Sequence, residues 1–174
     1  MQFLLIIALS IASAVIYGIL HDQITARVCV EYFTIGHPPV FNTEDPTLLG
    51  LGWGIIATWW VGVILGVGLA MVARIGRRPK RSPKSLIRPI GILMAIMAVF
   101  AITAGIAGYT AGSLGWVFLV GHIAETVPPE KHVPFLADMW AHSASYLVGF
   151  VGGIVVMVRV WMSRGTMARL KDEG

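Results

Sequence analysis

The sequence has few charged side chains and a single cysteine. Only 13% of its 174 residues are charged, 56% are hydrophobic, and the mean hydropathy is +0.78. A soluble domain needs a mixed, charged surface to stay dissolved, so this composition excludes an ordinary soluble domain. Because Cys29 is the only cysteine, the chain can form neither an internal disulfide nor a Cys-x-x-Cys redox pair.

Several motifs that would identify a reaction are also absent. The sequence contains no paired Glu-x-x-His motifs of di-iron bundles, no His-Glu-x-x-His of zinc proteases and no Cys-x-x-Cys-His for haem attachment. Gly50, Gly52 and Gly54 lie inside an apolar run and do not follow a strand, which argues against a nucleotide-binding loop. The motifs therefore leave the reaction open.

Long apolar runs are what the sequence does contain. They cover residues 3–20, 48–73, 89–111 and 141–162. Each run reaches or approaches the roughly 20 residues that a helix needs to cross a 30 Å hydrocarbon core. The many alternating segments of a membrane barrel are not found. We therefore predict an all-α integral membrane protein, a four-transmembrane-helix bundle, as a single domain over residues 1–174.

The first run also has a feature of a cleavable signal peptide. Ala12-Ser13-Ala14 resembles the small-residue pattern that a signal peptidase cuts. However, no Lys or Arg precedes the run, and its apolar character continues to Leu20. These two features favour a retained membrane span.

Cations are concentrated in the connection 74–88 and in the C-terminal tail. They are Arg74, Arg77, Arg78, Lys80, Arg81, Lys84, Arg88, Arg164, Arg169 and Lys171. Cytoplasmic loops retain Lys and Arg in membrane proteins. We therefore predict a bacterial inner-membrane protein with both termini and the basic loop in the cytoplasm, and with segments 21–47 and 112–140 on the periplasmic side.

The two outer segments are rich in acids and histidines. They hold seven of the nine carboxylates, and the five histidines fall in them or directly beside them. Two of these, His37 and His132, lie near prolines in loops, where a solvated or backbone-bonded histidine is typical. The net charge of +4 thus comes from basic residues on the predicted inner side, where they would face anionic lipid. We therefore predict no nucleic-acid partner.

Each apolar run carries small residues at a spacing of four. The stripes are Ser10, Ala14, Gly18; Thr58, Gly62, Gly66, Ala70; Ala104, Gly108, Gly112; and Ala141, Ser145, Gly149, Gly153. Small residues let helix backbones approach closely in lipid. The stripes predict a compact bundle within one chain, although a stripe could instead pair with a second copy or within a larger membrane complex.

Helix ends are indicated by proline and glycine. Asp45-Pro46 is typical of an N-cap followed by the first helical residue, and Pro89 and Pro134 are expected to begin the third and fourth helices.

Two helices are expected to extend beyond the membrane on the outer side. Nothing breaks a helix between Leu20 and Thr34, and the third helix can continue past Gly112 to Pro128 with a bend at its glycines.

A lower group of polar residues is expected where the helices leave the membrane. His21 and Asp22 end the first run, and Asp22 continues its small-residue stripe, so Asp22 should face the bundle. Asp138 and His142 are four residues apart, which lets a carboxylate orient a histidine as in many metal sites. Tyr146 is expected to complete this polar pocket.

An upper group is expected further from the membrane. It consists of Glu31, His122 and Glu125, of which the last two share one helical face. The alternative is a set of surface pairs, with Arg27 bound to Glu31 and Glu125 bound to Lys131 or Arg27, each worth little.

The leading functional hypothesis is a metal site on the outer side with redox or hydrolytic chemistry. Its candidate ligands are His21, Asp22, Glu31, His122, Glu125 and His142. The supporting residues are Asp138, Tyr146 and Arg27. A transition metal is favoured over haem, because the histidines lie at the boundary and not at mid-bilayer.

Two other classes of function are considered. The first is a non-catalytic accessory or assembly subunit of a larger membrane complex. The second is a transporter, which is disfavoured because the middles of the spans contain neither a charge nor a helix-breaking proline.

Overall fold

The computed structural model describes residues 1–172, which form helices and no strand. The elements in chain order are α1 (Gln2–Val28), α2 (Val30–Thr34), α3 (Pro46–Ile56), α4 (Trp59–Arg74), α5 (Lys84–Ser113), α6 (Gly121–Thr126), a 3₁₀ turn (Pro129–Lys131) and α7 (His132–Asp172). Four stretches are long and apolar enough to cross a membrane: Gln2–Val28, Pro46–Arg74, Lys84–Ser113 and Pro129–Thr166. The predicted all-α class with four long apolar helices is confirmed.

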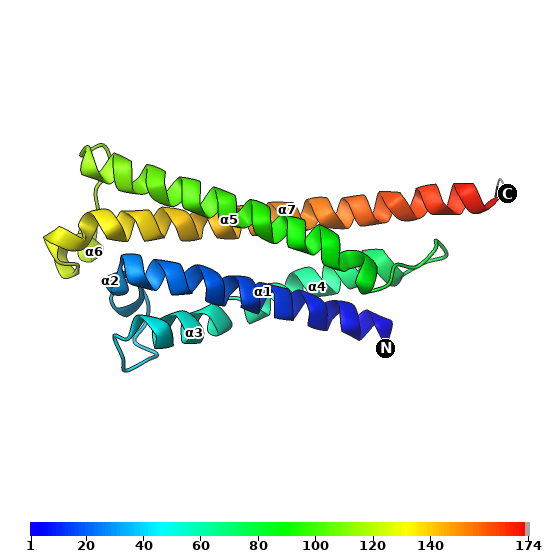
Figure 1. The fold of residues 1–174 in the computed structure, drawn as a ribbon, viewed down its shortest axis with the longest axis horizontal. Coiled ribbons are helices and arrows are strands. Elements are labelled where there is room, and N and C mark those ends of the chain that lie inside the picture. Colours follow the sequence, from blue (N-terminus) through cyan, green and yellow to red (C-terminus); the bar gives the residue numbers. More distant parts are fainter. Residues whose placement is uncertain (173–174) are drawn as a thin grey trace.

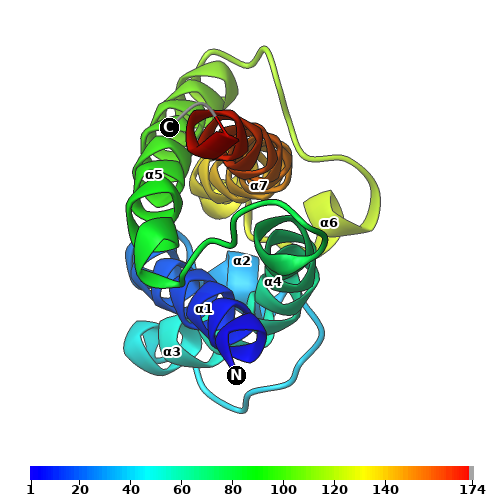
Figure 2. The ribbon, with the colours of Figure 1, turned by 90° about the vertical axis from the view of Figure 1, so that its right-hand side faces the viewer.

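The long helices are arranged as two pairs. Helix α5 packs along α7, and α1 packs along α3 and α4 (Figure 1). In the view along the helices, the two pairs face each other across the molecule (Figure 2). Packing is dense within each pair and sparser between the pairs. The bundle is therefore divided along its length into two halves.

The polar connections lie at opposite ends of the bundle. The N-terminus, the C-terminal end of α7 and the α4–α5 connection share one end, which we call the basic end (Figure 1). Helices α2 and α6 and the chain around them, residues 29–45 and 114–131, share the other end, which we call the histidine end. Most cations and most histidines are thus separated by the length of the helices.

The second apolar run, expected as one helix over residues 48–73, is interrupted. Helix α3 ends at Ile56 and α4 begins at Trp59, with Thr58 at φ −120° and ψ −25° between them. The Thr58 hydroxyl donates to the carbonyl of Gly54 one turn earlier. A threonine that binds back to the preceding turn competes with the helical ladder and bends helices, so a break forms here without a proline.

The helix starts follow the predicted signals in part. The Asp45 carboxylate accepts the first backbone N–H groups of α3 at 2.9 Å, which confirms the predicted N-cap. Helices α5 and α7 begin earlier than expected, at Lys84 and His132, so Pro89 and Pro134 do not begin them. Pro134 lies in the first turn of α7, where backbone N–H groups lack helical partners and proline is tolerated.

Of the two helix extensions expected at the histidine end, the first is interrupted and the second is not formed. Cys29 is extended, at φ −149° and ψ 102°, and separates α1 from α2. Helix α5 ends at Ser113 because Gly115 adopts φ +70° and the Trp116 N–H binds the carbonyl of Ala111 at 2.9 Å. This is a Schellman C-cap, which requires a left-handed residue and stops the helix where the sequence suggested a bend.

The small-residue stripes pack helices inside the chain. A Cβ on Gly54 would lie 2.6 Å from the Ile19 Cα, and one on Gly62 would lie 2.7 Å from the Ile11 Cα. Gly108 meets α7 at a similarly short distance. Close backbone approach therefore joins α1 to α3 and α4, and α5 to α7.

The basic end is organised by one buried arginine. Arg164 on α7 is 0% exposed, and its guanidinium donates to four backbone carbonyls, those of Val72, Ile75, Arg78 and Pro79. The bonds to Pro79, Ile75 and Arg78 are 2.8, 2.9 and 3.0 Å long. Arg164, expected as a tail cation, is therefore a cap for the C-terminus of α4. The side chains of Arg169 and Lys171 lie outside the described part of the chain.

Candidate metal site

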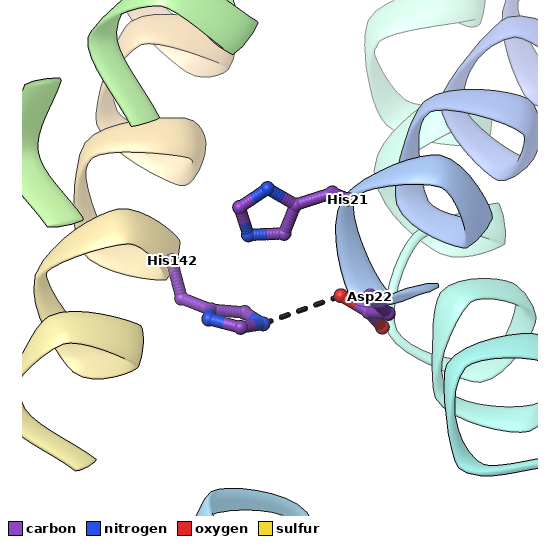
Figure 3. Close-up of side chains that lie close together, drawn as sticks. All are labelled: His21, Asp22 and His142. Carbon is purple, nitrogen blue, oxygen red and sulfur yellow. Dashed lines mark hydrogen bonds and ion pairs between the residues drawn. The ribbon is translucent and has the colours of Figure 1, made fainter. Parts of the chain in front are cut away.

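Three side chains converge between the two helix pairs near the histidine end. His21 and Asp22 come from α1 and His142 comes from α7, and they point toward a common space (Figure 3). One ligand atom from each residue lies within 4.8 Å of the others. We call these three residues the triad. Asp22 and His142 are buried, with exposed fractions of 4% and 8%.

The hydrogen bonds of His142 determine what the triad can bind. Its Nδ1 is 2.8 Å from the backbone carbonyl of Asp138, so Nδ1 carries a proton and donates. Its Nε2 then presents a lone pair in the neutral ring, only 3.2 Å from Oδ1 of Asp22 (Figure 3). Two acceptors at this distance need a shared proton or a cation between them.

The third member of the triad has an unsatisfied nitrogen. His21 Nε2 is buried and has no hydrogen-bond partner within the described residues. The His21 and His142 rings meet edge to face, with centroids 4.5 Å apart. Buried polar atoms in folded proteins are almost always paired, so an unpaired imidazole nitrogen beside two acceptors indicates a place for a ligand.

Asp138 supports the triad differently from the sequence-based expectation. Its backbone carbonyl, and not its carboxylate, holds the His142 ring. The carbonyl one turn back on the same helix is within reach of Nδ1, so the carboxylate is not needed for this bond. Asp138 itself is 1% exposed, and its Oδ2 has no partner in the part of the chain that the structure describes.

Aromatic side chains enclose the triad from several elements. Tyr32 on α2 stacks on the His142 ring at a centroid distance of 4.5 Å, and Tyr17 stacks on His21 at 5.8 Å. The Tyr17 hydroxyl is 2.8 Å from Ser145 Oγ. Tyr146, expected to support the site, donates its hydroxyl to the carbonyl of Ala57 at 3.4 Å, in the break between α3 and α4.

The upper group expected around Glu31, His122 and Glu125 is not assembled. Glu31 pairs with Lys131 at 3.2 Å, while His122 and Glu125 are exposed on α6. In the described residues, the triad is the one set of three or more potential ligands with this spacing. Helix α5 ends at Ser113, before the left-handed Gly115, and the following chain carries α6 to the far side of α7 from α5 (Figure 2). His122 and Glu125 therefore do not lie on a continuation of α5, as the sequence analysis expected.

Arg27 does not pair with Glu31. Its guanidinium donates to the backbone and side-chain oxygens of Gln23 and, at 2.9 Å, to the Thr47 hydroxyl. Arg27 thus joins α1 to the start of α3 and has no hydrogen bond to the triad.

His37 and His132 both bind backbone carbonyls, as their positions near prolines indicated. His37 Nδ1 lies 2.8 Å from the carbonyl of Tyr32, and His132 Nε2 lies 2.9 Å from that of Val127.

Two groups at the histidine end have shifted pKa values. Burial raises the pKa of the Cys29 thiol to about 12, so it stays protonated at neutral pH and is a poor metal ligand. Burial also raises the pKa of Glu31, but hydrogen bonds from its own backbone, Lys131 and Cys29 outweigh this effect and leave the pKa below its usual value.

Comparisons of this chain with protein families, with curated proteins and with solved structures found no match. The geometry of the triad and of the surrounding helices is therefore the basis for a functional proposal.

Proposed function

We propose that this chain is a four-span membrane protein that binds a transition-metal ion at His21, Asp22 and His142. The observation that carries the proposal is the approach of three ligand atoms within 4.8 Å, from helices far apart in the sequence. Two imidazoles and a carboxylate suit Zn²⁺, Fe²⁺ and similar ions. Three protein ligands leave coordination positions free, as in catalytic sites, so the ion would have redox or hydrolytic chemistry available.

The membrane location is supported by how little of the apolar surface is covered. In the most apolar window of Lys84–Ser113, only 6% of the residues are buried, and exposed side chains there include Ile92, Val99, Phe100 and Ile106. A soluble monomer rarely exposes so large an apolar surface, whereas lipid matches it. By the positive-inside rule we place the basic end in the cytoplasm of a bacterium and the triad near the periplasmic face of the inner membrane.

Orientation can be tested with two single-cysteine variants, because native Cys29 is buried. Glu130→Cys should react with a membrane-impermeant maleimide on intact spheroplasts. Arg77→Cys should react only after the membrane is opened. Both positions are exposed, so equal labelling of the two from outside would reject the orientation.

Metal binding can be tested by elemental analysis of the purified protein. After loading with Mn²⁺, Fe²⁺, Co²⁺ or Zn²⁺ and removal of excess, we expect about one ion per chain for at least one metal. Asp22→Asn and His142→Ala should lose most of it, by roughly tenfold or more. His122→Ala is the matched control, because His122 is an exposed histidine outside the triad. No stoichiometric metal under any loading would reject the proposal.

A further inference from the structure

A groove follows the boundary between the two helix pairs and ends at the triad. It lies between α1, α4, α5 and α7 and has a cavity volume of about 140 Å³. On α1 its lining runs from Ser10 to Asp22, and on α7 from His142 to Met157. At 1.5 Å per helical residue, these stretches correspond to a length of roughly 20 Å. The groove is therefore long and thin.

The two ends of the groove differ in chemistry. At the triad end it is lined by polar groups, including Tyr17 and Ser145 as well as the three triad residues. The remainder is lined mainly by aliphatic and methionine side chains such as Leu65, Leu93, Met97 and Met157. Its hydroxyl side chains are Ser10, Ser13 and Thr58, and those of Ser10 and Thr58 donate to backbone carbonyls of the preceding helical turn. A molecule that matched this lining would have one polar end and one long apolar end.

The charged residues in the groove lining indicate which kind of headgroup the groove can bind. Among the described residues, the groove is lined by no Lys or Arg, but Asp22 contributes a carboxyl group to the lining. In the metal-free protein, a phosphate or carboxylate headgroup would meet no cation there and would face the desolvation cost of an unpaired anion. Hydroxyl, imidazole and carboxyl groups suit instead a headgroup with hydroxyl or carbonyl oxygens.

Two glycines of α7 are covered by flexible side chains of the groove. Gly149 and Gly153 form part of the α7 wall, opposite Met97 and Leu65 respectively. Methionine side chains are flexible and adapt to an irregular guest. The groove is thus narrow, apolar and adjustable along the length that a hydrocarbon chain would occupy.

We propose that this groove binds a membrane-soluble amphiphile with one hydrocarbon tail and an uncharged, oxygen-containing headgroup. The headgroup lies beside Tyr17, Ser145 and the triad, and the tail lies between α4 and α7. The inference rests on the proposed membrane location but does not need the metal ion. A second copy of the chain or a separate helix could also cover the groove, and the experiment below distinguishes these occupants.

The probe is hexadecanol with a photoreactive diazirine in its chain, added to the metal-free protein in lipid nanodiscs. Matched probes carry a carboxylate or a trimethylammonium group in place of the hydroxyl. After illumination, mass spectrometry identifies the labelled peptides. We expect the alcohol to label segments containing Leu65, Met97 and Met157, with competition by unlabelled alcohol and weaker labelling by both charged probes.

Gly149→Leu tests whether the label comes from the groove. A Cβ at Gly149 meets only the flexible end of Met97, so this variant should fold while filling the groove. Labelling of the groove should fall by about tenfold. The leucine side chain would displace roughly two methylene groups of the bound probe, and losing their burial lowers the affinity by about that factor. Gly91→Leu is the matched control on α5, since a Cβ there has nothing within 4 Å.

Several results would overturn the groove proposal. Equal labelling by all three probes on the outward faces would show ordinary boundary lipid. A crosslink that joins two chains across the groove, or unchanged labelling in a folded Gly149→Leu protein, would also reject it. Labelling that persists in protein shown to bind no metal would support the groove while rejecting the metal site, and bound metal without groove labelling would do the reverse.

Discussion

The two ends of this bundle bury polar side chains in opposite ways. At the basic end, the Arg164 guanidinium is enclosed and donates to four backbone carbonyls, so its hydrogen-bonding capacity is used by the protein itself. At the histidine end, His21 Nε2 and Asp138 Oδ2 are buried without partners in the described residues. A buried group with all its partners maintains structure, whereas buried groups without partners have capacity left for a ligand.

The largest expected effect comes from removing the satisfied group. Arg164→Ala would leave the C-terminal carbonyls of α4 without donors in a buried position and is expected to destabilise the protein by about 3 kcal/mol. For a chain of this length, that corresponds to a fall of about 10 °C in the unfolding temperature. Arg159→Ala, an exposed arginine on the same helix, is the control and should change little in a thermal unfolding experiment.

Equal unfolding temperatures for Arg164→Ala and Arg159→Ala would show that the carbonyl contacts of Arg164 contribute nothing. The claim that the buried Arg164 stabilises the basic end would then be rejected.

The next largest change in unfolding temperature is expected from metal loading, which acts only at the histidine end. An ion that binds the folded state stabilises it by about 2.7 kcal/mol at 100 times its Kd. The unfolding temperature of the wild-type protein should therefore rise on loading, and chelation should reverse the rise. Asp22→Asn should show no such response, while Arg159→Ala should respond like the wild type. A rise of the same size in Asp22→Asn would place the ion elsewhere.

Substitution of His21, whose Nε2 has no partner among the described residues, should have a smaller effect on stability. In metal-free protein, His21→Leu removes a buried nitrogen that has no hydrogen bond, so stability should stay within about 1 kcal/mol or increase. A thermal unfolding experiment on the metal-free variant measures this change in stability. A loss as large as that in Arg164→Ala would mean that His21 is already fully used in the fold.

The smallest effect is expected at the partly exposed Lys131–Glu31 pair. Because the folded-state pKa of Glu31 is lowered, its contribution to stability is present above its ordinary pKa of 4.5 and is lost as pH falls through the lower folded value. Lys131→Ala should therefore lower stability slightly at pH 7 and not at the acidic end of the titration. Denaturant unfolding at several pH values measures this, and a difference that grows toward low pH would contradict it.

Much of the architecture could be predicted from local sequence physics. The length and polarity of the apolar runs predicted the four long helices, and Asp45-Pro46 predicted the start of α3. Continuation of the small-residue stripe placed Asp22 on the inward face of α1, where the structure buries it. These features depend on helical spacing within one segment, which a sequence displays directly.

The remaining features depend on contacts between segments or on finer backbone choices. The break at Thr58 has no proline to reveal it, and Gly115 ends a helix that the sequence suggested would only bend. The burial of Arg164 requires the α4 carbonyls to lie beside α7. Tyr17 was not included among the site residues, although its position four residues before His21 places it on the same helical face.

The central claim is that both histidines of the triad bind one ion, and X-ray absorption spectroscopy of the Zn²⁺-loaded protein tests it most directly. The account predicts two imidazole ligands per ion at about 2.0 Å in the wild-type protein. The smaller amount of zinc that His21→Ala or His142→Ala binds at raised zinc concentration should have one. An oxygen-only shell, or two imidazoles retained in both variants, would contradict it.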